Sequence, residues 1–414
     1  MRSMLAPLLG TIFFILLAVY AFQAVKTVIA DIPNALKVSV KAVFWLAQLV
    51  LVAWFWYVII KMGGDRKNMA WMTWMAYMVL LVVPQIVLVL PLAMEDLYRL
   101  GRSFVLWLSK LFTAEPITTD LDSRRKFISQ LALGLAAIPF FSILYGITKG
   151  KYNYRIRKET LSFKDLPEAF DGFTLCQISD VHAGSFDNKE RVEYGINLIN
   201  EQGADVILFT GDMVNNTADE LDPWQDVIAK LNAPYGKYSV LGNHDYGDYI
   251  DWPRMEDKGA NLEDLKKRHR EMGFRLLLNE NEALEKDGQK ISLVGVENWG
   301  LPPFVQYGDL DKALNGAEPF KVLLSHDPSH FDEQVCKRDE HIHLTLSGHT
   351  HGMQFGIEIP GIRWSPVKYK YPKWAGLYEK AQRYLYVNRG FGFLAFPGRV
   401  GIWPEITLIE LKKA

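Results

Sequence analysis

Cysteine is scarce in this sequence, with two residues among 414, Cys176 and Cys336. Two thiols so far apart exclude a disulfide framework and the paired-cysteine spacing of a zinc finger. Cys176 lies inside an apolar run, so we expect it to be buried in a core. The cysteines leave the redox compartment undecided.

A large overall charge is also missing, because the formal net charge is −1. This near-zero total combines two unlike parts. Residues 1–150 hold 14 basic and 7 acidic residues, a net charge of +7. Residues 151–414 hold 32 basic and 40 acidic residues, a net charge of −8. This difference predicts a boundary near residue 150. The acidic second part lacks the basic surface that nucleic-acid-binding proteins use, so we expect no nucleic-acid partner.

Charged residues are absent from four long apolar stretches, which cover residues 4–25, 42–60, 70–93 and 127–147. Each has roughly 20 residues, enough to cross a hydrocarbon core of about 30 Å as a helix. A soluble core helix seldom stays uncharged on every face, and a transporter would carry charges along an ion path. We therefore predict a membrane region with about four transmembrane helices over 1–148, a juxtamembrane linker over 149–162 and a catalytic domain over 163–414.

Arg124 and Arg125 precede the fourth stretch. Paired arginines before a moderately apolar stretch resemble a twin-arginine export signal, and they equally suit a positively charged cytoplasmic flank. Both interpretations place the C-terminal domain on the extracytoplasmic face of the cell membrane. The loops agree, with nine basic residues inside against four outside, although the basic residues at 149–158 oppose this orientation. The four basic residues counted as outside are Arg2, Lys61, Arg66 and Lys67.

The C-terminal part repeats one pattern, a short apolar run that ends in polar residues able to bind metal. The five motifs at these ends are D-V-H at 180–182, G-D at 211–212, G-N-H-D at 242–245, H-D at 326–327 and G-H-T-H-G at 348–352. Short apolar runs predict buried strands, and amphipathic segments at 189–202 and 223–231 predict helices between the first three. Since ligands gather at the carboxyl ends of strands in such sheets, we expect the motifs to meet.

The spacing within the motifs suggests how the side chains converge. Residues i and i+2 of an extended backbone point to the same side, so Asp180 with His182, and His349 with His351, should each direct two side chains inward. Glycines such as Gly211 let the backbone turn sharply just before a candidate ligand. Aspartate, asparagine and histidine without cysteine form a ligand set that suits Mn²⁺, Fe or Zn²⁺.

Complete and in this order, the five motifs resemble those of the calcineurin-like metallophosphoesterase superfamily, and the multi-span anchor resembles its bacterial membrane-attached branch. The resemblance covers about residues 163–412. One departure is Asn215, which stands where the family often has an aspartate, and which leaves the metal ligands untouched. The fold implied is α/β, an αββα sandwich of two sheets flanked by helices.

The resemblance further implies two adjacent divalent metal ions, of Mn, Fe or Zn. The first ion would be held by Asp180, His182 and His351, and the second by Asn243, His326 and His349. Asp212 would bridge both ions, and His244 would face the substrate phosphate without binding metal.

The reaction implied by the resemblance is hydrolysis of a phosphate mono- or diester by a metal-bound hydroxide, with His244 stabilising charge or protonating the leaving group. No serine or cysteine nucleophile motif competes with this mechanism. A nearby bilayer favours a lipid-linked or envelope phosphate ester as substrate. The alternative is a catalytically weak membrane sensor or scaffold that keeps the metal site.

Several residues near the motifs have two interpretations. Asp245 could orient His244 through a carboxylate–imidazole hydrogen bond. Arg389 lies in a glycine-rich segment and could meet a phosphate oxygen, or it could be a solvated residue of a turn.

His269 and His330 are expected at the surface, and the acidic run at 280–287 is expected to form an exposed hairpin that turns at Asp287-Gly288.

Overall fold

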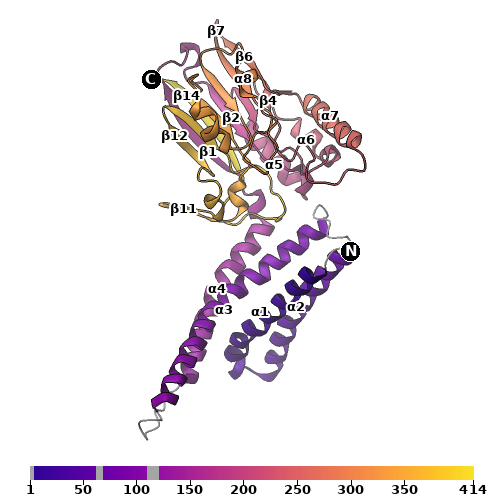
Figure 1. Cartoon of the computed structure of the whole chain (residues 1–414), viewed down its shortest axis with the longest axis vertical. Coiled ribbons are helices and arrows are strands. Elements are labelled where there is room, and N and C mark those ends of the chain that lie inside the picture. Colours follow the sequence, from indigo (N-terminus) through magenta and orange to yellow (C-terminus); the bar gives the residue numbers. More distant parts are fainter. Residues whose placement is uncertain (1–3, 62–68, 110–120) are drawn as a thin grey trace. The chain divides into compact units, whose positions relative to one another are not determined.

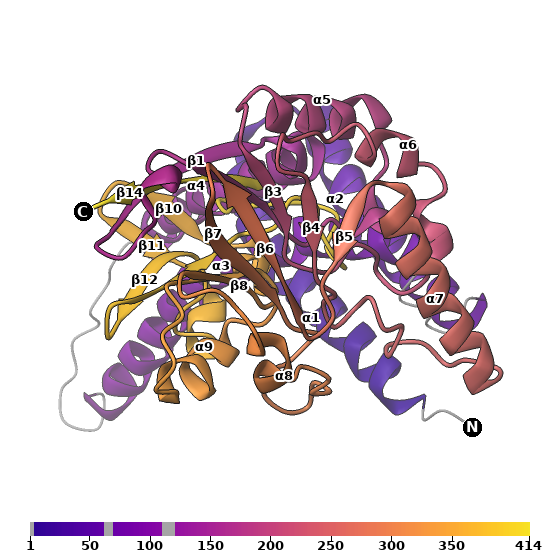
Figure 2. The ribbon, with the colours of Figure 1, turned by 90° about the horizontal axis from the view of Figure 1, so that it is seen from above.

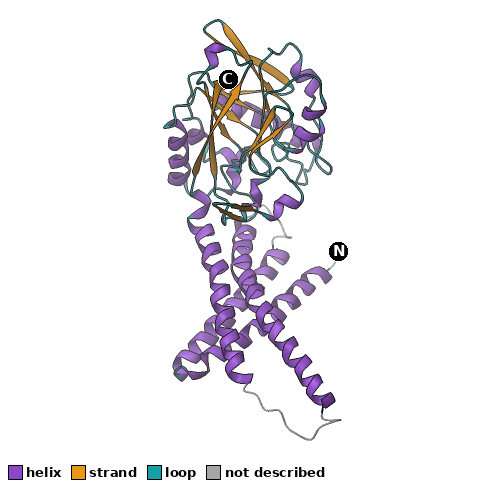
Figure 3. Cartoon of the chain, turned by 90° about the vertical axis from the view of Figure 1, so that its left-hand side faces the viewer, coloured by secondary structure: helices purple, strands orange, loops and turns teal. Residues whose placement is uncertain are grey.

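The computed structural model describes residues 4–61, 69–109 and 121–414, and the chain divides into two compact units, Met1–Tyr145 and Gly146–Ala414 (Figure 1). The described part of the first unit is helical, whereas the second combines helices with strands (Figure 3). Four of the basic residues counted for the membrane orientation, Arg2, Arg66, Lys67 and Lys110, lie outside the described residues.

The first unit consists of long apolar helices, as predicted. Its helices are α1 (Leu5–Val28), α2 (Asn34–Lys61), α3 (Met69–Ser109) and α4 (Leu121–Thr148). Among the described residues, these four are long and apolar enough to cross a membrane. Large apolar side chains such as Leu16 and Val43 are exposed on this unit, which is where lipid would cover them.

Helix α3 continues past its expected end at residue 93, and the continuation carries two acidic residues. Glu95 Oε2 lies 3.0 Å from Nε of Arg124, and Asp96 Oδ1 lies 2.5 Å from a guanidinium nitrogen of Arg125. The Glu95 side chain is fully buried, so its charge requires a partner. The arginine pair therefore joins α4 to α3, in addition to either targeting role.

Two sheets face each other in the second unit. Within the described residues each has six strands, in the orders β1-β14-β2-β3-β4-β5 and β12-β13-β9-β8-β7-β6. The first sheet contains β1 (Arg155–Phe163), β2 (Thr174–Ile178), β3 (Val206–Phe209), β4 (Lys237–Ser239), β5 (Phe274–Leu276) and β14 (Glu405–Lys413). The second contains β6 (Glu280–Lys286), β7 (Gln289–Gly295), β8 (Lys321–Leu324), β9 (Leu344–Ser347), β12 (Gly376–Lys380) and β13 (Arg383–Val387). A separate hairpin pairs β10 (Ile357–Ile359) with β11 (Ile362–Trp364).

Helices cover the outer face of each sheet, which confirms the predicted αββα sandwich (Figure 2). Those on the first sheet are α5 (Lys189–Asn200), α6 (Gln225–Ile228) and α7 (Met255–Glu271), and those on the second are α8 (Leu310–Leu314) and α9 (Ser329–Glu333). Strands β2, β3 and β4 run parallel, so the expected β-α-β-α-β unit is present. Helix α5 buries Val192, Ile196 and Ile199, which lie on one face at helical spacing.

Apolar side chains from both sheets fill the space between them. Leu175, Leu208 and Val240 of the first sheet share one buried cluster with Leu293 and Leu346 of the second. The expected burial of Cys176 is confirmed, with no exposed surface. This core fixes the strand ends that carry the five motifs.

The expected linker over 149–162 is largely folded instead, because β1 pairs in parallel with β14 along its whole length. The charged residues of β1 resemble a basic membrane flank. Within this strand only Leu161 and Phe163 are buried. The hairpin turn at Asp287-Gly288 is confirmed, and both residues have positive φ, 47° and 74°.

The expected surface positions of His269 and His330 are wrong, because both side chains are fully buried. Each imidazole finds a strand-end hydroxyl: His269 Nδ1 lies 3.1 Å from Ser239 Oγ, and His330 Nδ1 lies 2.8 Å from Ser325 Oγ. The charged residues next to His269 and His330 in the sequence thus suggested exposure, although both histidines belong to the core.

Candidate metal centre

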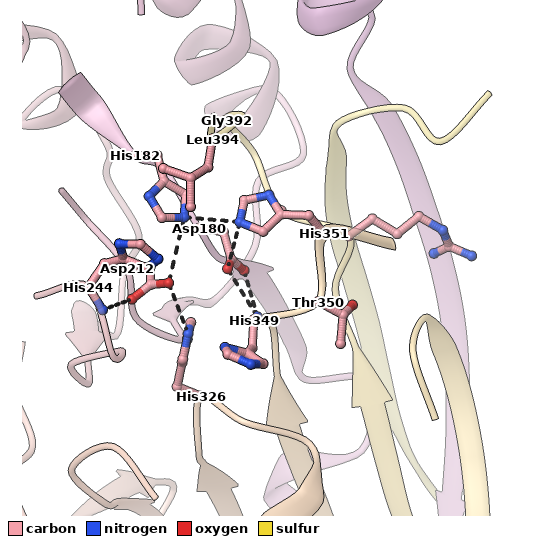
Figure 4. A network of polar contacts seen from close by, with 12 residues as sticks. Asp180, His182, Asp212, His244, His326, His349, Thr350, His351, Gly392 and Leu394 are labelled. Carbon is pink, nitrogen blue, oxygen red and sulfur yellow. Dashed lines mark hydrogen bonds and ion pairs between the residues drawn. The ribbon is translucent and has the colours of Figure 1, made fainter. Parts of the chain in front are cut away.

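The five motifs meet at the carboxyl ends of β2, β3, β4, β8 and β9 (Figure 4). Their side chains form two groups, and within each group the possible ligand atoms lie within 4.8 Å of one another. The first group is Asp180, His182 and His351, and the second is Asp212, His326 and His349.

In the first group, two imidazoles and a carboxylate converge. His182 Nε2 lies 2.9 Å from His351 Nε2, which lies 3.2 Å from Asp180 Oδ1. Asp180 and His182 have no exposed surface. The other nitrogen of His182, Nδ1, is buried without a hydrogen-bond partner.

One carboxylate oxygen lies between the two groups. Asp212 Oδ2 is 3.1 Å from His326 Nε2 and 3.6 Å from His182 Nε2. Asn243 completes the second group, because its Oδ1 lies 3.1 Å from His326 Nε2 and 2.8 Å from His349 Nδ1. The structure thus brings together all seven residues that the resemblance assigned as ligands.

The backbone that carries these side chains is left-handed rather than extended. Values of φ are positive at Asp180 (51°), His182 (49°), Asp212 (60°), His349 (70°) and His351 (50°). The expected extended i and i+2 geometry is therefore wrong, and tight left-handed turns bring the side chains together. Non-glycine residues in this region cost roughly 1–3 kcal/mol each and gather at functional sites.

Glycines beside the ligands leave room for the carboxylates. A Cβ atom at Gly242 would lie 2.7 Å from the backbone nitrogen of Asp212 and would overlap its carboxylate. At Gly348, a Cβ atom would overlap Ser179 and Asp180. Only glycine allows this approach of backbone to carboxylate.

A backbone carbonyl fixes the orientation of His326. Its Nδ1 lies 2.7 Å from the carbonyl oxygen of Thr210, and a carbonyl only accepts hydrogen bonds, so Nδ1 carries the hydrogen. Nε2 therefore presents its lone pair toward Asp212 when the ring is neutral.

The buried centre brings carboxylates and imidazoles close together, and each shifts the pKa of the other. Burial raises the pKa of Asp212, but the neighbouring imidazoles of His326 and His244 outweigh it, so that the pKa lies well below its usual range. Burial lowers the pKa of His326, but the carboxylate of Asp212 outweighs it and raises the pKa to about 10. Two buried carboxylates, Asp180 and Asp212, thus require positive charge beside them, which divalent cations would also supply.

His244 is held at both its backbone and its ring. Its backbone N–H donates to Asp212 Oδ1 at 2.8 Å, and its Nδ1 lies 2.8 Å from the carbonyl oxygen of Asn215. The departure from the family pattern at 215 leaves this bond intact, because the backbone makes it. The Asn215 side chain bonds to Ser185 instead.

The carboxylate of Asp245 bonds to backbone amides, and the Nδ1 atom of His244 is engaged by Asn215, so the possible carboxylate–imidazole bond is not formed here. The Asp245 carboxylate accepts hydrogen bonds from the backbone N–H groups of Gly242 (2.9 Å), Asp212 (2.9 Å) and Met213 (2.8 Å), because the tight G-N-H-D turn directs it at the loop after β3. Burial raises the pKa of this carboxyl to about 7. Asp245 therefore joins two ligand-bearing loops.

Arg389 is buried rather than solvated, and its guanidinium bonds to Glu405 and, at 2.7 Å, to Glu358. The backbone that follows it supports the metal centre instead. The N–H of Gly392 donates to the carbonyl oxygen of Asp180 at 2.9 Å, and the N–H of Phe391 donates to that of Ser179 at 2.7 Å.

Three further residues contact the candidate ligands and escaped the sequence analysis. The first is Tyr249, whose hydroxyl accepts a hydrogen bond from the Asn243 side-chain amide at 2.7 Å. The hydroxyl of Tyr371 lies 2.8 Å from His349 Nε2, and the fully buried Arg399 lies 3.3 Å from His351 Nδ1. Tyr371 and Arg399 belong to no motif, and each comes from a loop distant in sequence, so no local pattern signals it.

Comparison with known families and proteins agrees with this geometry. Residues 1–151 match the family described as "Probable Calcineurin-like phosphoesterase, transmembrane domain", and residues 173–353 match "Calcineurin-like phosphoesterase". The chain is 33% identical over 261 residues to the uncharacterized metallophosphoesterase YkuE of Bacillus subtilis, which covers 62% of this chain and 84% of that protein.

Two more relatives match longer segments. The transmembrane protein with metallophosphoesterase domain of Danio rerio is 26% identical over 330 residues, which is 77% of this chain and 69% of that protein. The phosphodiesterase YaeI of Escherichia coli is 28% identical over 294 residues, which is 70% of this chain and 99% of that protein.

Proposed function

Because this chain belongs to the calcineurin-like metallophosphoesterase family, we propose that it is a membrane-anchored enzyme that hydrolyses a phosphate mono- or diester with two divalent metal ions. One observation carries the proposal: two buried groups of ligand atoms meet at a shared carboxylate, Asp212. A single ion would need only one of these groups.

The proposed ligands follow the geometry. Asp180, His182 and His351 hold one ion, Asn243, His326 and His349 hold the other, and Asp212 lies between them. Oxygen and imidazole donors without a thiolate suit Mn, Fe or Zn. Such a pair of ions supplies an activated water and neutralises charge on the phosphoryl oxygens.

The chain itself contributes His244 to the reaction. The Nδ1–H group is engaged by the carbonyl of Asn215, so Nε2 is the nitrogen that can bond to a phosphoryl or leaving-group oxygen. Tyr249 packs against the imidazole at a tilt, with ring centroids 4.5 Å apart, and restrains it. Asp245 acts as a positioning residue through the amides of both loops. Arg389 has no part in this proposal, because two glutamates engage it.

The test is an assay of the full chain, purified in detergent, stripped of metal and reloaded with Mn²⁺. We expect metal-dependent hydrolysis of nitrophenyl phosphate or bis(nitrophenyl) phosphate and no cleavage of nucleic acid. Asp212→Ala is the matched control. A chain that retains two ions without turning over either ester would support the alternative, a membrane sensor or scaffold.

We further propose that the second unit lies on the extracytoplasmic face. The loop charges and the arginine pair at the start of α4 support this orientation. Asp287 lies in the exposed turn of the β6–β7 hairpin. In a Cys336→Ser background, Asp287→Cys should react with a membrane-impermeant thiol reagent in intact cells. Labelling only after lysis would place the unit in the cytoplasm.

A further inference from the structure

The β10–β11 hairpin, residues 357–364, exposes three isoleucines directly after the last metal motif. Ile357 is 50% exposed, Ile359 is 56% exposed and Ile362 is 52% exposed. Apolar side chains exposed side by side on a soluble domain usually mark a site that binds another surface.

The hairpin is amphipathic, but its apolar side chains are exposed, whereas a soluble protein would normally bury them. Cross-strand partners share a face, so the pair Ile359–Ile362 lies on one face and the pair Glu358–Arg363 on the other. Contacts show which face meets the domain. Glu358 bonds to Arg389 and, at 3.0 Å, to Arg157, and the Arg363 guanidinium lies 5.8 Å from the ring centroid of Trp374. The ion pairs of Glu358 therefore attach the polar face to the domain, whereas the three isoleucines and Arg363 are exposed.

Basic residues lie in the second strand of the hairpin and in the segment after it, without acidic ones among them. Arg363, Lys368, Lys370 and Lys373 lie within eleven positions, in a part of the chain whose net charge is −8. Lys368 and Lys370 are exposed, and Tyr369 between them is 77% exposed. Lysine and tyrosine beside an apolar surface are typical of a bilayer interface, where their polar ends meet headgroups.

The chain itself keeps a bilayer within reach. Helix α4 ends at Thr148 and β1 begins at Arg155, so residues 149–154 connect them. A fully extended connection of this length spans about 20 Å. The second unit is therefore tied to the membrane surface at which α4 ends.

We propose that the β10–β11 hairpin is a membrane-contacting element. Its isoleucines insert among the lipid acyl chains of the bilayer, and Lys368 and Lys370 contact the phosphates of anionic headgroups. Bilayer lipid suits both the apolar face and the positive charge beside it, whereas a soluble partner would have to supply acidic and apolar surfaces together.

The same segment reaches the candidate metal centre. Tyr371 bonds to His349, and it lines a cavity of about 290 Å³ together with Lys370, Lys373 and Leu301. Insertion of the hairpin would bring headgroup phosphates beside this cavity, whose lining also includes Asp332 and Glu333. If the chain is a phosphoesterase as proposed above, its substrate class is then a phosphate ester of a membrane lipid. The membrane contact itself does not depend on that function.

The contact is tested by a fluorescent probe on the full chain in vesicles of phosphatidylethanolamine and phosphatidylglycerol. In a Cys336→Ser background, Ile359→Cys carries a nitrobenzoxadiazole label, and Asp287→Cys in the polar β6–β7 hairpin is the matched control; Cys176 is buried. We expect blue-shifted emission at 359, quenched by lipids with a nitroxide on the acyl chain, and water-like emission at 287.

Two outcomes would overturn the proposal. Water-like emission at both positions would mean that the hairpin stays solvated. Blue-shifted emission at 359 without quenching by the labelled lipid would mean that a protein surface, such as a second copy of the chain, covers the isoleucines.

A second measurement separates this inference from the proposed function. Replacing Ile357, Ile359 and Ile362 by serine should lower turnover of a phosphatidyl phosphate ester in vesicles by about tenfold or more and leave turnover of nitrophenyl phosphate unchanged. Equal turnover of the lipid by both chains would refute the role of the hairpin in presenting it. No turnover of the lipid by an unmodified chain that hydrolyses nitrophenyl phosphate would refute the lipid substrate. Failure of the unmodified chain on every ester would refute the proposed function and leave the probe result standing.

Discussion

The two sheets of the second unit bring unlike chemistry to the candidate metal centre. Among the proposed ligands, the loops after β2, β3 and β4 supply Asp180, His182, Asp212 and Asn243, and those after β8 and β9 supply His326, His349 and His351. Both ligand carboxylates come from the first sheet, and the ligands from the second sheet are imidazoles alone. The first sheet should therefore control whether cations bind at all, and the second should control how each is held.

The strongest test of this difference compares Asp212→Ala with His326→Ala. Loss of the shared carboxylate should remove both ions and reduce hydrolysis to background, because it takes a ligand from each site and a charge from both. Loss of His326 should remove one ion. Elemental analysis of the purified chains counts the ions, and retention of both by Asp212→Ala would contradict the shared role.

His244 follows a strand of the first sheet but binds no metal in our assignment. Replacing it therefore tests whether every side chain that the first sheet brings to the centre is a metal ligand. We expect His244→Ala to keep both ions and to slow hydrolysis by about 10²–10⁴-fold. The loss should shrink for esters with good leaving groups such as nitrophenol, which need little protonation. An equal loss for all esters would leave only charge stabilisation, and loss of an ion would make His244 a ligand.

On the second side, two groups restrain the imidazole of His349: the hydroxyl of Tyr371, and the carboxylate of Asp327 after β8, whose Oδ2 lies 3.5 Å from His349 Nε2. Tyr371→Phe removes the hydroxyl that lies 2.8 Å from His349 Nε2. Affinity for one ion should fall by about 10-fold, as when other residues that orient a ligand are lost. Tyr369→Phe, two residues away and exposed, is the matched control. Metal titration should separate the two variants, and identical affinities would exclude the orienting role.

The smallest effect concerns His269, a buried histidine of α7 outside the centre. Burial lowers its pKa to about 3, so the folded chain keeps it neutral while the unfolded chain takes up a proton below about pH 6.5. Stability should fall as the pH drops from about 6.5 toward 3, by about 2 kcal/mol at pH 5.

The variant His269→Gln removes this titration and should therefore show a smaller decrease in Tm between pH 7 and pH 5 than the unmodified chain. Fluorescence-monitored thermal unfolding of the full chain in detergent measures both decreases. An equal decrease in the two chains would show that other groups govern the acid sensitivity.

Local sequence patterns sufficed for the membrane helices and for the strands before the motifs. The seven residues that the family resemblance proposed as ligands lie close together in the fold. Hydrophobic runs and motif residues are contiguous in the chain, so their chemistry can be recognised without tertiary information. For the same reason Asp287-Gly288 predicted its turn correctly.

Long-range contacts decided the rest. The charged strand β1 exists because β14, about 250 residues later, pairs with it. Tyr371 and Arg399 reach the ligands from loops without a motif, and Asp245 turned to backbone amides that only the folded loops present. A sequence pattern cannot reveal a partner that the fold alone brings near.

The left-handed residues of the metal centre restrict which substitutions the chain can explore. Aspartate, asparagine and histidine enter this backbone region more readily than other side chains do, and β-branched residues are nearly excluded from it. At Asp180, Asp212 and His351 the residue type thus satisfies ligand chemistry and backbone conformation together. A chain that abandoned catalysis would still be held near these residue types by its fold, so intact motifs in a relative are weaker proof of activity than of ancestry.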